Sequence, residues 1–224
     1  MNILFIGNSY TYFNRMPETL EALAHAADID ASVASVTKGG YTLEALASDE
    51  NEYGARVGAM LAGDTKFDCI ILQEQSVRPA VDSEKFFGGV AAMLDKIRLC
   101  QPDARVILYE TWGRKAGNPV LAEHGWTPEK MYGLLRDSYA AAAVRFGLDV
   151  SHVGAAFARV TAERQDIGLY NDDLTHPSPA GSYLAACVHF ATVFRISPEC
   201  AAYCGDLDAG TAEYLRRTAW EISQ

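Results

Sequence analysis

Short apolar runs alternate along this chain with segments that have helical spacing. A continuous apolar run is typical of a strand buried on both faces, and such strands occur in parallel sheets that helices cover. The runs fall at residues 3–6, 31–36, 69–72, 105–109 and 148–150, and the helical segments at 16–27, 42–47, 53–61, 82–100, 127–146, 155–163, 179–194 and 209–222. The pattern predicts a three-layer α/β/α sandwich of the flavodoxin-like kind, with about five parallel strands.

The organisation of the chain indicates a single domain over residues 1–224, because no linker, internal repeat or low-complexity tract interrupts the alternation. In sheets of this kind, ligands bind beyond the carboxyl ends of the strands. We therefore expect the functional site in the loops that follow the first four strands, which are residues 7–14, 37–41, 73–79 and 110–125.

Charge and hydropathy exclude several kinds of partner. The chain has 19 Lys and Arg against 29 Asp and Glu, a formal net charge of −10, and no basic run. Nucleic-acid binding needs clustered cations, so we expect no nucleic-acid partner. No apolar run approaches the roughly 18 residues of a membrane span. The first residues lack the basic region of a secretory signal, which predicts a cytoplasmic protein without a membrane partner.

A serine near one end and a histidine near the other suggest nucleophilic catalysis. Ser9 follows the first predicted strand, and His176 follows Asp173 by three residues. Serine is a weak nucleophile that needs a base, and an imidazole base needs a group that fixes its tautomer. We therefore predict a catalytic set of Ser9, His176 and Asp173, with Asp172 as a competing carboxylate.

Two further loops offer hydrogen-bond donors. Gly39 and Gly40 follow the second predicted strand, where a glycine leaves a backbone N–H open to close approach. The polar segment from Gln73 to Ser76 follows the third strand, and a side-chain amide there could donate to a developing oxyanion. An ordinary turn and a solvated loop are the alternative interpretations.

Taken in order, these segments resemble the blocks of the SGNH, or GDSL-like, hydrolase superfamily of esterases and lipases. Gly-Asn-Ser ending at Ser9 matches the first block, Gly40 the second, and Asp173-Leu-Thr-His176 the last. The third block usually reads Gly-x-Asn, which places Gln75 at the asparagine. The resemblance implies an oxyanion hole formed by the backbone N–H groups of Ser9 and Gly40 and by the Gln75 side chain.

The chain departs from that pattern at two positions. Asn8 stands where the family has an aspartate before the nucleophile, and glutamine replaces the asparagine of the third block. Glutamine is one methylene longer, so Gln73 is a rival for the donor role. This chain is similar to a less characterised branch of the superfamily.

The predicted function is that of an esterase acting on a small-molecule or carbohydrate ester, with O-acetyl groups of carbohydrates as one candidate. Water completes the turnover, and no metal or cofactor is expected. Gln73, Glu110 and Trp112 lie in the predicted site loops and are candidate substrate contacts.

Two other functions are compatible with the pattern. A degenerate SGNH-like protein would bind its ligand without turnover. A flavodoxin-like module would instead hold phosphate or flavin on the loop after the first strand, at a helix N-terminus. That second interpretation leaves Asp173 and His176 without a role.

Overall fold

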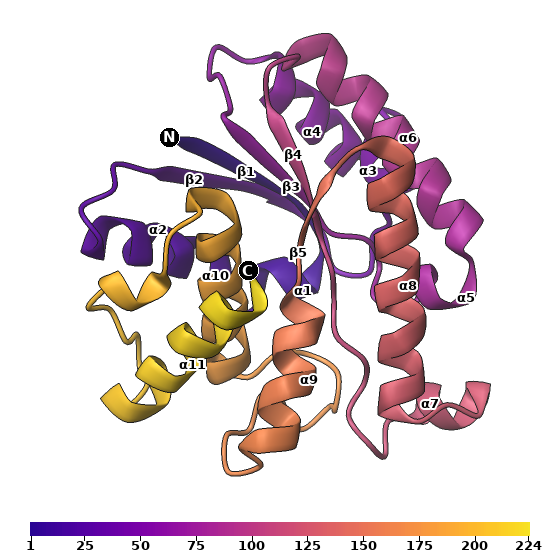
Figure 1. The fold of residues 1–224 in the computed structure, drawn as a ribbon. Helices are drawn as coiled ribbons and strands as arrows, with labels where there is room; N and C mark the ends of the chain where they lie inside the picture. Colours follow the sequence, from indigo (N-terminus) through magenta and orange to yellow (C-terminus); the bar gives the residue numbers. More distant parts are fainter.

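The computed structural model describes residues 1–224 and contains one five-stranded, all-parallel sheet (Figure 1). Its strands are β1 (Asn2–Gly7), β2 (Ser32–Thr37), β3 (Cys69–Leu72), β4 (Arg105–Tyr109) and β5 (Asp149–Ser151). They lie in the order β2-β1-β3-β4-β5, which is the flavodoxin-like order. The predicted fold is confirmed.

The two faces of the sheet carry separate hydrophobic cores, because successive side chains of a strand point to opposite faces. In β1, Ile3 and Phe5 pack in one core and Leu4 and Ile6 in the other. The first core is completed by α2 (Met16–Ala26), α9 (Val153–Glu163), α10 (Pro179–Phe194) and α11 (Ala209–Ile222). The second is completed by α3 (Leu43–Ala47), α4 (Glu52–Ala62), α6 (Ser83–Cys100) and α8 (Pro128–Phe146), on the opposite side in Figure 1.

Most helix ends follow the capping chemistry of the sequence. The Asp82 side chain accepts from the Lys85 N–H at the start of α6, and the Thr127 side chain accepts from the Lys130 N–H at the start of α8. Gly147 ends α8 in the left-handed conformation, with φ 66°. Both α10 and α11 have the predicted ends, whereas β2 and β5 each begin one residue later than predicted.

Several short elements were not predicted. They are α1 (Ser9–Tyr12), α5 (Arg78–Val81), α7 (Pro119–His124) and the 3-10 turns η1 (Phe13–Arg15) and η2 (Pro198–Cys200). The start and stop signals of α7 are nevertheless present, with Asn118 as its cap and Gly125 in the left-handed conformation behind it. Its Leu121 packs against α8, which holds this part of the loop after β4 in place.

The topology brings the predicted site loops to one edge. Connections leave β1 and β3 in opposite directions, and ligands bind at such a switch point in open α/β sheets. Ile6 pairs with Leu72, so the segments that follow β1 and β3 begin side by side. No helix is long and apolar enough to cross a membrane.

Candidate active site

Ser9 lies at the first turn after β1, in a loop fixed by hydrogen bonds. Asn8 caps α1, because its side-chain oxygen accepts from the Tyr10 N–H at 3.3 Å. Its amide nitrogen donates to the Tyr41 carbonyl at 3.0 Å, which ties this loop to the loop after β2. An aspartate could not make that second bond, since a carboxylate has no donor when ionised. The departure at Asn8 therefore links two site loops.

The structure brings Ser9, His176 and Asp173 together. His176 Nε2 lies 2.8 Å from Ser9 Oγ, and its Nδ1 lies 2.5 Å from Asp173 Oδ2. The other Asp173 oxygen accepts from the backbone N–H groups of Thr175 and His176 at 3.0 and 2.9 Å. The contacting carboxylate is that of Asp173 and not that of Asp172.

Hydrogen bonding sets the charge of Asp173. Burial alone would raise the pKa of its carboxyl group, but the hydrogen bonds from the His176 ring and from two backbone N–H groups lower the pKa below its ordinary value. The group is therefore an anion beside the imidazole at neutral pH, as a group that orients and stabilises a histidine must be.

Neighbouring segments hold the loop that carries His176 next to Ser9. The Phe13 ring stacks on the His176 ring at 4.2 Å with an interplanar angle of 9°. Asn14, in the left-handed conformation at φ 51°, donates to the Pro177 carbonyl at 2.8 Å. From the loop after β4, Asn118 donates to Thr175 Oγ1 at 2.8 Å. One aromatic ring thus stacks on the imidazole, and side-chain hydrogen bonds hold the residues on either side of it in the chain.

Of the predicted oxyanion donors, Gly40 is exposed and Gln75 is partly exposed. Gly40 is exposed and has φ 75°, which favours glycine, and nothing lies within 4 Å of the position that a Cβ would take. The Gln75 side-chain oxygen accepts from the Val77 and Arg78 N–H groups, each at 2.9 Å. This arrangement turns the Gln75 oxygen toward α5 and leaves its NH₂ group as the donor.

Gln73 does not fit the predicted substrate contact, because it is fully buried. Its side-chain oxygen accepts from the Asn8 N–H at 2.8 Å and from Thr11 Oγ1 at 3.1 Å, and its amide nitrogen donates to the Glu74 carbonyl. Gln73 therefore braces the nucleophile loop from beneath. Of the two glutamines, Gln75 is the one that is partly exposed.

Glu74 was missed by the sequence reasoning. This buried carboxylate accepts from the Gln75 N–H at 2.6 Å and from the Leu43 N–H at 3.2 Å, so it joins the loop after β3 to the start of α3. Burial raises the pKa of its carboxyl group to about 7. In the sequence, only its position directly before Gln75 indicates a role in the site, because its partner Leu43 is 31 residues away.

Trp112 does not line the predicted substrate site. Its ring is 1% exposed and lies between the Tyr10 and Phe157 rings, at 4.3 and 4.0 Å with interplanar angles of 4°. Its Nε1 donates to the Thr175 carbonyl at 3.1 Å. Trp112 is a core residue that supports the histidine loop from below, and the prediction of a substrate contact is wrong.

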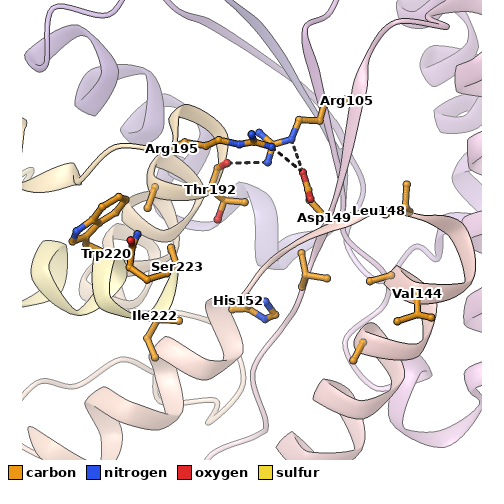
Figure 2. Close-up of a pocket in the computed structure, with 15 residues that line it drawn as sticks. Arg105, Val144, Leu148, Asp149, His152, Thr192, Arg195, Trp220, Ile222 and Ser223 are labelled. Carbon is orange, nitrogen blue, oxygen red and sulfur yellow. Dashed lines mark hydrogen bonds and ion pairs between the residues drawn. The ribbon is translucent and has the colours of Figure 1, made fainter.

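Glu110 is also buried, at 1% exposure, and cannot contact a substrate at the site edge. It accepts from Tyr132 Oη at 3.1 Å, from the Ala155 N–H at 3.1 Å, and pairs with His152 Nδ1 at 2.8 Å. His152 lines a groove of about 750 Å³ along the open edge of β5, between α8 and the ends of α10 and α11 (Figure 2). Ser9 and His176 do not line this groove.

The fold is an α/β/α sandwich in which a serine, a histidine and an aspartate lie in contact at the carboxyl edge of the sheet. Among solved structures, the chain is similar to a candidate SGNH hydrolase from Slackia heliotrinireducens, with 33% identity, a TM-score of 0.75, and coverage of 86% of this chain and 98% of that chain. The chain belongs to the SGNH hydrolases. Membership places it among the carboxylic ester hydrolases.

More distant structures share the fold. A DUF4886 family protein from Bacteroides uniformis matches 99% of this chain and 94% of its own, with a TM-score of 0.84 at 19% identity. An acetyl xylan esterase matches 86% of this chain and 100% of its own, with a TM-score of 0.63 at 14% identity. No family model and no curated protein matches the chain.

Proposed function

We propose that this protein hydrolyses small carboxylic esters through an acyl-enzyme on Ser9. The observation that carries the proposal is the 2.8 Å contact between His176 Nε2 and Ser9 Oγ, with Asp173 on the other ring nitrogen. A general base must lie within hydrogen-bond reach of the proton that it removes. The carboxylate on Nδ1 keeps Nε2 free to accept that proton.

The reaction follows from this geometry. Ser9 Oγ attacks the ester carbonyl while His176 Nε2 takes the hydroxyl proton, and Asp173 stabilises the imidazolium that forms. The tetrahedral intermediate collapses as His176 returns the proton to the departing alcohol. Water then attacks the acyl-Ser9 ester with His176 again as base, which releases the carboxylic acid and restores the hydroxyl.

The intermediate carries a negative charge that needs donors fixed in advance. The backbone N–H groups of Ser9 and Gly40 and the Gln75 amide are the proposed donors. The orientation of Gln75 supports its role, because its oxygen is engaged by the Val77 and Arg78 N–H groups. Its NH₂ group is thereby the end available to an oxyanion.

The proposed substrate carries a short acyl group on a sugar. Three hollows of about 750, 700 and 270 Å³ are lined by residues other than Ser9 and His176, so none of these three would hold an acyl chain bound at the nucleophile. The Tyr12 side chain is 42% exposed and lies close to Gly39. The Tyr12 hydroxyl oxygen is 3.0 Å from the position that a Cβ atom on Gly39 would take. Exposed aromatic rings suit the apolar faces of sugars. The acetyl xylan esterase named above shares the fold.

Labelling with a fluorophosphonate probe tests the mechanism. The wild-type protein and the control Ser35→Ala, which changes an exposed serine of β2, should be labelled equally, and Ser9→Ala should not be labelled. Ser9→Ala should also lower kcat by a factor on the order of 10³ or more. Labelling that maps to another serine overturns the mechanism, and a folded wild type that neither labels nor turns over indicates a degenerate binding protein.

A substrate panel tests the acyl and alcohol preference. Rates with p-nitrophenyl acetate, p-nitrophenyl octanoate and acetylated xylo-oligosaccharides should favour acetate over octanoate, with acetate release from the sugars. The variant Tyr12→Ala should raise KM for the acetylated sugar more than for p-nitrophenyl acetate. Faster hydrolysis of octanoate contradicts the assignment of a short acyl group.

A further inference from the structure

A buried cation without a charged partner lies next to the proposed oxyanion donor. Arg114, in the loop after β4, is 8% exposed. Its Nη2 donates to Ser76 Oγ at 2.9 Å, while Nε and Nη1 have no hydrogen-bond partner and the side chain takes part in no ion pair. A buried unpaired charge is costly unless its surroundings compensate for it.

Two contacts connect Arg114 to the reacting groups. Ser76, its hydrogen-bond partner, directly follows Gln75. The guanidinium also lies 5.7 Å from the centre of the Tyr10 ring, and Tyr10 directly follows Ser9. The Tyr10 ring in turn packs edge-on against the His176 ring at 5.8 Å. The positive charge thus lies between the nucleophile segment and the loop that carries Gln75.

The burial of Arg114 argues against direct contact with a substrate. The two nitrogens without partners are inaccessible to solvent, and the third is bonded to Ser76. The side chain can still act in two ways: through the hydrogen bond that holds Ser76, and through its charge, which is weakly screened in a buried position.

We propose that Arg114 is a positioning residue of this esterase: by holding Ser76 it fixes the neighbouring Gln75 amide at the oxyanion, and its charge favours the negatively charged intermediate. This inference rests on the proposed function, because it assigns the oxyanion contact to Gln75.

Kinetics of four variants, Arg114→Met, Arg114→Lys, Ser76→Ala and Gln75→Ala, test the proposal with p-nitrophenyl acetate as the probe. Arg114→Met should lower kcat by about 10-fold or more with KM nearly unchanged, since removal of an interaction specific to the transition state has that signature. Arg114→Lys keeps the charge and a hydrogen-bond donor, so it should recover most of the kcat lost in Arg114→Met. Ser76→Ala should lower kcat with KM nearly unchanged.

A double-mutant comparison separates positioning from a general effect on folding. If Arg114 acts through Gln75, then Arg114→Met should add little to the kcat loss of Gln75→Ala, because coupled residues are non-additive. Arg216 provides the matched control: it is also buried, at 9% exposure, donates to Tyr183 Oη and has an unpartnered Nε, but lies on α11. Arg216→Met should lower the thermal midpoint while leaving kcat unchanged.

Any of the following results would overturn the proposal. Kinetic losses that multiply fully in Arg114→Met/Gln75→Ala show that Arg114 does not act through Gln75. A rise in KM confined to esters that carry a carboxylate shows substrate binding. Should Arg114→Met fail to fold, Arg114→Lys and Ser76→Ala decide the matter, and wild-type activity in Ser76→Ala counts against the brace. Retained turnover in Ser9→Ala would refute the catalytic mechanism itself, independently of Arg114.

Discussion

The molecule contains two histidine–carboxylate pairs at the carboxyl edge of its sheet, and only one of them contacts a serine hydroxyl group. His176 Nδ1 lies 2.5 Å from Asp173, and His152 Nδ1 lies 2.8 Å from Glu110. At His176 the second ring nitrogen contacts Ser9 Oγ, whereas His152 turns toward the groove along β5 (Figure 2). The orienting carboxylate is common to both regions, so the hydroxyl group is what distinguishes a catalytic arrangement.

The two pairs differ in which member is buried: the histidine is the less exposed member of the first pair, and the carboxylate is the less exposed member of the second. The His176 side chain is 25% exposed beside a carboxylate that is 48% exposed, whereas the His152 side chain is 46% exposed above a carboxylate that is 1% exposed. Glu110 also accepts from the Ala155 N–H at the start of α9, so it supports a helix as well as a histidine. The hydrogen bond to Glu110 raises the pKa of His152. The second pair has the features of a structural contact.

The largest expected effect is the loss of the base in the first pair. His176→Ala should lower kcat by a factor on the order of 10⁴, because the nucleophile is no longer activated. Acetate release from p-nitrophenyl acetate measures it, with circular dichroism as the check on folding. A variant that retains more than about a tenth of the wild-type kcat contradicts the role of His176 as base.

The orienting carboxylate is expected to matter almost as much. Asp173→Asn should lower kcat by about 10³, since an amide can no longer hold the reactive tautomer and stabilise the imidazolium. Glu110→Gln makes the equivalent change in the second pair and should leave kcat within about a factor of three of the wild type while lowering the thermal midpoint. If Asp173→Asn and Glu110→Gln lower kcat equally, the claim that only the first pair is catalytic is contradicted.

The oxyanion contact comes next in size. Gln75→Ala should lower kcat by about 10²-fold and leave fluorophosphonate labelling intact, since one donor is lost while the nucleophile remains. Gln73→Ala removes the brace under Asn8 and should instead reduce both labelling and thermal stability. Normal turnover in Gln75→Ala would leave the oxyanion to backbone N–H groups alone.

How far the sequence predicts this molecule depends on how local each interaction is. Asp173 and His176 are three residues apart, and one turn of chain aligns them, so their pairing could be read directly. The apolar runs likewise predicted a parallel sheet of about five strands. Glu110 and His152 are 42 residues apart, and no local sequence pattern at either position indicates that they pair.

The same limit explains the incorrect substrate contacts. Trp112 was expected at the site edge because it follows a strand, but its ring is enclosed by Tyr10 and Phe157 from other parts of the chain. Polar residues after a strand can face either the ligand or the interior. Gln73 and Gln75 lie two positions apart in the same loop, and only the fold shows that the first is fully buried.

Glu74 is a buried carboxylate with no histidine partner, so the pH dependence of its effect on stability can be compared with that of the two pairs. Glu74 has its pKa raised by burial from 4.5 to about 7 in the folded protein, so folding favours its protonated form. Its stabilising contribution is present below the unfolded pKa and is lost as pH rises through about 7. Glu74→Gln should remove this loss, on the order of 2–3 kcal/mol, so that the stability of the variant relative to the wild type increases from pH 5 to pH 8. Urea unfolding at several pH values measures the trend, and parallel curves would contradict the buried ionisation.

The smallest effect is expected at the second histidine, where pairing gives stability without catalysis. The pKa of His152 is raised above the ordinary value of 6.5 by Glu110, so its stabilising contribution is fully present below that unfolded value and is lost as pH rises through the folded value. Because the side chain is about half exposed, solvent screening limits the contribution to about 0.5 kcal/mol. His152→Gln should therefore be less stable than the wild type at pH 5.5, approach it at pH 8.5, and retain the wild-type kcat at both values. A loss of kcat in His152→Gln would show that the second pair also serves the reaction, and the contrast between the two pairs would have to be abandoned.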